Sequence, residues 1–456
     1  MRRVVKVSRI RIIITIIVVV LTTLLTGCTG KEPNEIAYVV ALGIDSTDDD
    51  NYKITIQYAN TTQISGGASE SGGKAGSEIV DNVTIEAPNI YAGVGLANNI
   101  VSKSFSMSHA KLIVFSKEIA EKGVKDMIET LVRSEEIRPD VFIAVANTTA
   151  NDYLTSVNPE MEVNPAQYYQ LIYQKNQLVG IPDGQLREFF TGLYTDNYDS
   201  ILPVAGVIEG AGGNSQNDDK GQSKDGQNEG SEGSSESLDS FESKSSDDKD
   251  ENEKEKDAEK NTSKYEYDIK NYVGGETAIE KKNKAEAIGA AVFEKDKMVG
   301  ELGEVETEIC KMLKGDYTYS YLTYYNNDTP DIPITVKTTQ QKKPKYKIDT
   351  DKKTVDIELY IESDLYSLPA EYNVENKIED FERDVANYTS SACTEFINNF
   401  TKKYNSDILK LNEKIKYKFL TNNQYNWFKK NVGWSEYKFS VCTNFKVRRT
   451  GLIVRE

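Results

Sequence analysis

Few side chains in this sequence are of the types that carry out catalysis or bind metal ions. The chain has one histidine, His109, and four cysteines, Cys28, Cys310, Cys393 and Cys442. The histidine and the cysteines are far apart and lack the spacing of a His/Cys zinc cluster, and the sequence contains neither an HExxH motif nor a Gly-x-Ser-x-Gly elbow. We therefore expect no catalytic residues, no metal site and no cofactor. His109 stands at the start of a predicted strand, where we expect a hydrogen-bonded structural residue.

Cys28 is the cysteine whose surroundings indicate a specific reaction. Five cations within the first 11 residues precede an Ile/Val-rich run, 12–25, and the run ends in Leu25-Thr26-Gly27-Cys28. A basic head and a short apolar stretch are typical of an export signal, and the stretch is shorter than the roughly 20 residues that span a bilayer. The four residues resemble the lipobox of bacterial lipoproteins, in which the Cys thiol receives a diacylglyceryl group and becomes the new N-terminus. We expect residues 1–27 to be a signal peptide and Cys28 to be the lipidation site. An uncleaved signal anchor, or an ordinary signal with an unmodified cysteine, is the alternative.

The charge balance excludes some partners. The whole chain has a formal charge of −17, and removal of residues 1–27 would leave 50 basic against 72 acidic residues, a net charge of −22. Nucleic acids and anionic lipid surfaces both attract basic patches. The composition therefore argues against nucleic acid or an anionic lipid surface as a binding partner.

The other three cysteines do not suggest a disulfide framework, because an odd number in an exported chain leaves at least one free thiol. Cys393 lies on a predicted long helix, and Cys442 lies on the last predicted strand, on the side opposite Phe439 and Val441. If the helix covers the apolar side of that strand, the two thiols point apart. A disulfide needs Cα atoms within about 7 Å and Cβ vectors that face each other. We expect unpaired thiols, with a Cys393–Cys442 bridge as the less favoured alternative.

Residues 28–208 are predicted to form an N-terminal α+β region. Two β-rich runs, 35–45 and 53–59, flank a turn that contains Asp45 and Asp48 to Asp50, which predicts a hairpin. We expect a solvated acidic turn there, because the spacing does not match a calcium loop. After a Gly/Ser stretch, helices and strands alternate, which favours a mixed sheet covered by helices. The later predictions are a helix at 88–103, a strand and helix within 109–123 ending at Gly123, a helix at 124–134, a strand within 135–146, helices within 149–193 and a strand at 201–207.

Residues 209–270 are predicted to be an acidic disordered linker or loop insertion. From 209 to 264 there are 17 acidic and 8 basic residues among Ser, Gly, Asn and Gln. Leu238 and Phe241 are the large apolar residues in that stretch. Such a segment cannot bury enough apolar surface to offset the entropy of ordering its chain.

Residues 271–456 are predicted to form a C-terminal α+β region whose clearest element is a long helix at 374–403. The apolar residues of that helix recur every three or four positions. In the last strand, 437–447, apolar and polar residues alternate strictly, which predicts one buried and one solvated face. The other predictions are two strands within 287–302, a helix at 303–313, antiparallel strands at 317–325, 331–338, 344–349 and 353–362, a helix near 406–414 and a Trp-bearing stretch at 424–434. The whole chain is therefore predicted to be an α+β, multi-domain protein with mixed and antiparallel sheets flanked by helices.

Several short blocks, in this order and spacing, resemble the Ger(x)C spore germination lipoproteins, the C subunits of germinant receptors. The likeness spans nearly the whole mature chain except the acidic insertion at 209–270. The blocks are the lipobox, 35–45, His109-Ala110-Lys111, 133–140, 291–302, Ser406-Asp407-Ile408, Trp434 and 448–452. Ser-Met-Ser-His at 106–109 departs from the family, whose members often have Gly-His there.

The resemblance implies three α+β domains and a function without catalysis. It implies membrane-embedded A- and B-type receptor subunits as partners, and a lipid-anchored position on the outer face of the cytoplasmic membrane, which is the inner membrane of the spore. We expect this chain to act in nutrient-triggered germination by scaffolding those subunits. A solute-binding lipoprotein of a transporter, built as two α/β lobes around a ligand cleft, and a structural lipoprotein of the spore envelope are the alternatives. The sequence identifies neither the germinant nor the partner-contact residues.

Overall fold

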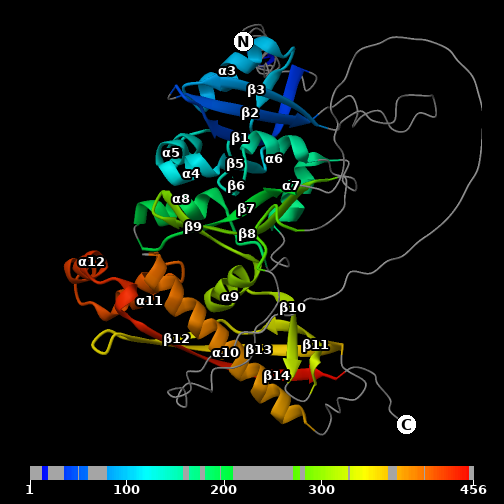
Figure 1. Cartoon of the computed structure of the whole chain (residues 1–456). Helices are drawn as coiled ribbons and strands as arrows, with labels where there is room; N and C mark the ends of the chain where they lie inside the picture. The colour runs from blue at the N-terminus through cyan, green and yellow to red at the C-terminus, as the bar shows by residue number, and fades with distance from the viewer. Residues whose placement is uncertain are drawn as a thin grey trace, which may run out of the picture. The chain divides into compact units, whose positions relative to one another are not determined.

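The fold was analysed in a computed structural model of the chain (Figure 1). It describes residues 13–18, 35–49, 51–59, 80–157, 164–174, 180–195, 197–208, 271–277, 283–326, 329–367, 377–404 and 406–450. Cys28 and the acidic segment at 209–270 lie outside the described residues, so the predictions made for them stay predictions. Within the described part of the chain, no helix is both long and apolar enough to cross a membrane.

The first sheet has nine strands in the order β3-β2-β1-β5-β6-β7-β8-β9, with β4 paired to β1. The middle strands β1, β5, β6 and β7 are parallel to one another, and the strands on both flanks are antiparallel. The predicted mixed sheet and the hairpin of its first two strands are therefore confirmed. The strands are β1 (Ile36–Ser46), β2 (Tyr52–Ala59), β3 (Val80–Ala87), β4 (Ser104–Ser106), β5 (Leu112–Ser116), β6 (Phe142–Ala146), β7 (Ile201–Val207), β8 (Ala285–Glu294) and β9 (Lys297–Leu302).

Helices cover both faces of this sheet, which explains why every residue of β5 and β6 is buried. One hydrophobic cluster joins the sheet to α3 (Ile90–Ile100), α4 (Lys117–Lys122), α5 (Lys125–Val132) and α8 (Leu186–Thr195). A second cluster joins its other face to α6 (Ala150–Ser156) and α7 (Pro165–Gln174). As predicted, α4 ends at Gly123, whose φ of 123° favours glycine.

The first sheet contains strands that precede the acidic segment in the sequence and strands that follow it. Strand β7 precedes the segment, β8 follows it, and the two pair antiparallel with Ile201 opposite Val292. The hairpin β8–β9, predicted within 287–302, thus completes the sheet that begins at β1. The described residues before and after the acidic segment accordingly belong to one structural unit.

The second sheet has five strands in the order β10-β11-β13-β12, with β14 paired to β13. The antiparallel pairing predicted for 317–362 is confirmed, whereas β14 runs parallel to β13. A parallel pair needs a long crossover connection, and helix α10 (Ile378–Lys403) lies within that connection. The strands are β10 (Tyr319–Asn326), β11 (Thr329–Gln340), β12 (Lys345–Asp349), β13 (Thr354–Ser367) and β14 (Lys438–Arg449).

A third hydrophobic cluster packs α10 and α9 (Glu304–Lys314) on the second sheet, and it extends to Ile201 and Val292 of the first. In Figure 1, α10 runs along the strands of the second sheet. The alternation predicted for 437–447 is confirmed, because Phe439 and Val441 are buried while Cys442 is exposed. Cys393 is buried on α10, and all three described cysteines are free thiols, as expected.

Helix α10 also covers the outer edge of β14. Acceptor side chains on the helix recur at four-residue steps, and backbone N–H donors on the strand recur at two-residue steps. Four helical residues rise about 6 Å and two strand residues about 6.7 Å, so the two series stay in register. We call these acceptors the α10 stripe. The pairs are Phe439 N to Asn398 Oδ1 (3.1 Å), Val441 N to Thr394 Oγ1 (3.0 Å), Thr443 N to Ser390 Oγ (2.9 Å) and Val447 N to Glu382 Oε1 (2.8 Å).

Two predictions were wrong in detail, one about the surroundings of Asp45 and one about the length of a helix. Asp45 is not in a solvated turn: its side chain is 4% exposed and accepts hydrogen bonds from Ala150 N (2.6 Å) and Asn151 N (3.0 Å). These amides are at the N-terminus of α6, whose unsatisfied donors attract a carboxylate. The helix predicted near 406–414 is shorter, since α11 covers only Leu411–Ile415.

Candidate functional site

The residues before α11 form a tight turn around a buried carboxylate. Asp407 is 5% exposed, and its Oδ1 and Oδ2 accept hydrogen bonds from Leu411 N and Asn412 N, both at 2.8 Å. Lys410 has a φ of 57°, a left-handed conformation that turns the chain into the helix. The two backbone donors satisfy a carboxylate that would otherwise be costly to bury. This is why Ser406-Asp407-Ile408 forms a turn and not the predicted helix.

The same turn is bonded to the first sheet through Asp199, which lies just before β7. Asp199 Oδ2 accepts from Asp407 N (2.8 Å), and Asp199 N donates to the carbonyl oxygen of Asp407 (3.2 Å). Asp199 Oδ1 accepts from Lys295 N (2.8 Å) in the β8–β9 turn, and Ser406 Oγ donates to Phe293 O (2.9 Å). We call this set, Asp199, Phe293, Lys295, Ser406 and Asp407, the junction. It connects three segments that are far apart in the sequence.

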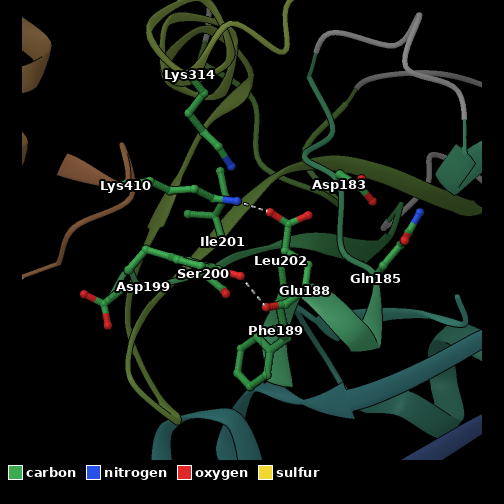
Figure 2. Close-up of a pocket in the computed structure, with 11 residues that line it drawn as sticks. Asp183, Gln185, Glu188, Phe189, Asp199, Ser200, Ile201, Leu202, Lys314 and Lys410 are labelled. Atoms are coloured by element: carbon green, nitrogen blue, oxygen red, sulfur yellow. Dashed lines mark hydrogen bonds and ion pairs between the residues drawn. The ribbon is translucent and has the colours of Figure 1, made fainter. Parts of the chain in front are cut away.

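Charged side chains flank the junction, as Figure 2 shows. Lys410 Nζ forms an ion pair with Glu188 Oε1 and lies 4.3 Å from the centre of the Tyr198 ring. Glu188, Tyr198 and Lys410 line a small cavity, and Asp183 and Lys314 line it as well. Its volume is about 10 Å³, which is the space of about one water molecule. A cavity of that volume cannot hold a ligand larger than water.

The electrostatics of this region follow from burial. Burial raises the pKa of Asp407 to about 7, although its two backbone donors oppose the shift. Burial also acts to raise the pKa of Glu188, but the hydrogen bond and charge of Lys410 outweigh it and leave that pKa below the usual value. For Asp183, burial prevails and the pKa is raised. The ionisation of Asp407 in the junction, and of Glu188 and Asp183 beside it, is thus linked to folding.

The hairpin β8–β9 makes a second contact with the chain after α10. A Cβ atom on Gly300 would overlap the ring of Tyr404, which follows the last residue of α10. Only glycine leaves room for that ring. Nearby, Trp434 Nε1 donates to Asn412 Oδ1 (3.2 Å), and the Trp434 ring packs against Tyr437 with centroids 4.8 Å apart. Gly300 and Trp434 both belong to blocks that the sequence resemblance singled out.

A second group of residues from the resemblance blocks meets between β4 and the start of β5. Met107 N donates to Glu136 Oε2 (2.7 Å), which joins the loop at 106–109 to the block 133–140. His109 is exposed, is 3.0 Å from Ser108 Oγ through Nδ1, and packs edge-on against Tyr38. These contacts agree with the structural role expected for His109.

Sequence reasoning missed Asp199, Glu188 and Lys410. Asp199 precedes an apolar strand as many loop residues do, and no spacing connects it to Asp407, which is more than 200 residues away. Among the described residues, no group of three or more His, Cys, Asp or Glu side chains could hold a metal ion.

Comparison with known proteins defines the class. The family model "Spore germination protein N-terminal domain" matches residues 30–207, and "Spore germination B3/GerAC like, C-terminal" matches residues 288–451. Together they cover more than half of the chain, which is therefore a spore germination protein. The chain belongs to the Ger(x)C family, the C subunits of germinant receptors, as the sequence resemblance indicated.

Individual relatives are distant. Spore germination protein KC of Bacillus subtilis (strain 168) is 26% identical over 174 residues, which cover 35% of this chain and 42% of the relative. Spore germination protein B3 of the same organism is 26% identical over 148 residues, 30% of this chain and 36% of the relative. The aligned part thus spans less than half of each relative. A solved structure titled "Crystal Structure of the GerBC protein" covers 89% of this chain and 96% of its own, with 15% identity and a TM-score of 0.47.

Proposed function

We propose that this chain is a non-enzymatic subunit of a spore germinant receptor, needed for nutrient-triggered germination, and that it acts by scaffolding the membrane subunits. Family membership supports the receptor role. The observation that carries the scaffolding role is the junction. Asp199 lies in the first matched region and Asp407 in the second, and they are hydrogen-bonded to each other. A firm connection between the two regions suits a protein that holds partners in a fixed arrangement.

A lipid on Cys28 would hold these regions on the outer face of the cytoplasmic membrane, the inner membrane of the spore. Tethering raises the local concentration of the folded part beside the A- and B-type subunits, so that modest contacts suffice for assembly. In this proposal the acidic segment at 209–270 is a tether or insertion between β7 and β8. The partners are the membrane subunits and, through the lipid anchor, the membrane, without nucleic acid.

Germination of spores tests this proposal. Spores that lack the chain should fail to respond to nutrient while remaining viable under a treatment that bypasses nutrient receptors. Complementation with the wild-type chain should restore the response, and Cys28→Ala should restore little of it. Cys442→Ala is the matched control, because Cys442 is exposed and unpaired within the described structure. Normal nutrient germination without the chain would contradict the proposal, and a defect in nutrient uptake alone would indicate a solute-binding lipoprotein.

A further inference from the structure

The stretch from Lys414 to Trp434 differs in chemistry from the rest of the chain. Its 21 residues contain five lysines and no acidic residue, although the whole chain has 72 acidic against 55 basic residues. It comprises the end of α11, η2 (Lys416–Lys418), α12 (Asn422–Asn431) and the start of η3 (Trp434–Glu436). We call it the lysine–aromatic excursion; Figure 1 labels α11 and α12 within it.

Three large apolar side chains of the excursion face solvent. Tyr417 is 80% exposed, Leu420 is 94% exposed and Trp427 is 64% exposed. Single exposed apolar residues are ordinary on protein surfaces, so it is the grouping of three on one short segment that makes this surface a candidate interaction site. These three lie within 11 residues of one another.

The exposed side chains stand on an ordered base. Phe419 packs against Tyr425 and Phe428, with ring centroids 5.7 Å and 5.1 Å apart, and Phe428 packs against Trp434 at 5.9 Å. Thr421 caps α12 by accepting a hydrogen bond from Gln424 N. The exposure of the apolar residues is therefore a property of the folded excursion.

Lysines surround the exposed apolar residues. Lys416, Lys418 and Lys430 are exposed, while Lys414 and Lys429 are half-buried. Lys429 Nζ donates to Asn197 Oδ1 (3.2 Å), so its charge is already partly used inside the protein. Lys418 Nζ donates to the carbonyl oxygen of Ile348, but Lys418 keeps its charge and an exposed side chain. With Lys416 and Lys430 it gives the excursion a cationic surface.

We propose that the lysine–aromatic excursion docks on the surface of an anionic lipid bilayer. Trp and Tyr favour the boundary between head groups and acyl chains, and adjacent lysines are attracted to anionic head groups. Trp427, Leu420 and Tyr417 would enter that boundary while the lysines face the phosphates. The expectation from net charge, which argued against an anionic lipid surface, does not hold for this local surface. The contact does not require lipid on Cys28, so it goes beyond the proposed function.

The acidic segment of the chain itself is the main competing occupant. It would complement the lysines, since residues 209–264 contain 17 acidic residues. Residues 209–264 offer only Leu238 and Phe241 as large apolar residues, however, fewer than the three exposed apolar side chains of the excursion. A bilayer satisfies both the charges and the apolar surface, and the observations therefore favour it.

Tryptophan fluorescence of the full chain on vesicles tests the proposal. The chain has two tryptophans, Trp427, which is exposed, and Trp434, which is 8% exposed. With the N-terminal segment holding the chain on the vesicles, phosphatidylglycerol should shift the Trp427 emission to the blue and allow quenching by brominated lipids. Phosphatidylcholine alone should produce little of either effect. Trp427→Phe supplies the background from Trp434.

The lysines are tested by a triple variant, Lys416→Gln with Lys418→Gln and Lys430→Gln. Each lysine near an anionic surface strengthens binding about fivefold, so the docked-to-undocked ratio should fall about a hundredfold. The matched control is Lys53→Gln with Lys125→Gln and Lys438→Gln, three exposed lysines of other elements, which should keep the quenching.

Three results would overturn the proposal: no change in Trp427 emission on phosphatidylglycerol, full quenching in the excursion variant, or equal loss in the control. Deletion of residues 212–262 tests whether the acidic segment, and not a bilayer, covers the excursion. If it alters Trp427 emission without vesicles, the acidic segment covers the excursion and the bilayer does not. The mass of the mature N-terminus reports lipidation at Cys28 separately, so failure of the anchor and failure of the docking surface are distinguishable.

Discussion

The junction and the α10 stripe satisfy backbone N–H groups in opposite ways. In the junction, the half-buried Asp199 accepts from amides on segments distant in the sequence, and the buried Asp407 accepts from two amides of its own turn. In the α10 stripe, mostly neutral side chains of one helix accept from successive amides of a single strand. The first arrangement concentrates the contact in a few ionisable groups, and the second distributes it over a repeating series.

The difference predicts how each region fails. Loss of either carboxylate leaves two backbone donors without an acceptor, and such orphaned donors are costly where they are buried. Loss of one stripe residue leaves a single donor unpaired while its neighbours still hold the strand. The stripe also occupies amides that an edge strand would otherwise offer to another chain. The junction is therefore the more vulnerable of the two.

Asp407→Ala should have the largest effect. It removes both acceptors for Leu411 N and Asn412 N, and each buried donor left unsatisfied costs about 1–3 kcal/mol, so we expect a loss of about 3 kcal/mol in the free energy of unfolding. Urea unfolding measures it. Glu413→Ala, an exposed neighbour, should stay within about 0.5 kcal/mol. A loss at Asp407 no larger than the control would show that the junction contributes little.

The second largest effect should be the pH dependence of stability, which we expect for the junction and not for the α10 stripe. The folded-state pKa of Asp407 is about 7, above its ordinary value of 3.8, so the folded state binds the proton more tightly than the unfolded state. The stability from this group is full below about pH 4 and is lost as the pH rises to about 7, with a slope of at most about 1.4 kcal/mol per pH unit.

Asp407→Asn should abolish this dependence, because the amide does not titrate. The measurement is the difference in unfolding free energy between wild type and Asp407→Asn across pH 4 to 8. It should decline up to about pH 7 and then level off. A difference that is constant with pH would contradict the assigned ionisation, whereas stripe variants such as Thr394→Val should show a constant difference.

Within the stripe, two adjacent asparagines form a matched pair. Asn398 accepts from Phe439 N and donates to Phe439 O (2.9 Å), whereas Asn399 is exposed. Asn398→Ala should cost about 2 kcal/mol, since each hydrogen bond contributes about 1 kcal/mol. Asn399→Ala should be neutral or slightly stabilising because alanine favours helix. Equal effects in thermal or urea unfolding would rule out the stripe as a stabilising contact.

The smallest effect should come from adding the acceptor that the α10 stripe lacks at Ala386. Ala386 stands at the four-residue step between Ser390 and Glu382, opposite Phe445, and it carries no acceptor. Ala386→Ser should gain about 0.5 kcal/mol, because a hydrogen bond of about 1 kcal/mol exceeds the helix-propensity cost of serine. A decrease in stability would mean that the hydroxyl does not reach the strand.

Much of the fold could be predicted from periodicity. The alternation at 437–447 identified the buried face of β14, and the three- and four-residue spacing identified α10. Periodicity depends on which side of an element meets the core, and that information is local. The same patterns separated the exposed Cys442 from the buried Cys393.

The junction could not be predicted in this way. Asp45 and Asp407 are of a residue type that is rarely buried, and each is buried because tertiary structure brings backbone donors to it. Asp199 carries no local signal at all. The resemblance to a known family singled out Ser406-Asp407-Ile408, but its contacts became evident only from the structure.

Capture of the intact chain from detergent-solubilised spore membranes tests the central claim most directly. The account predicts that the wild-type chain is recovered together with A- and B-type germinant receptor subunits, in similar amounts. It also predicts that Asp407→Ala recovers much less of them than Asn399→Ala. Recovery of the wild-type chain without either membrane subunit would contradict its assignment as a receptor scaffold.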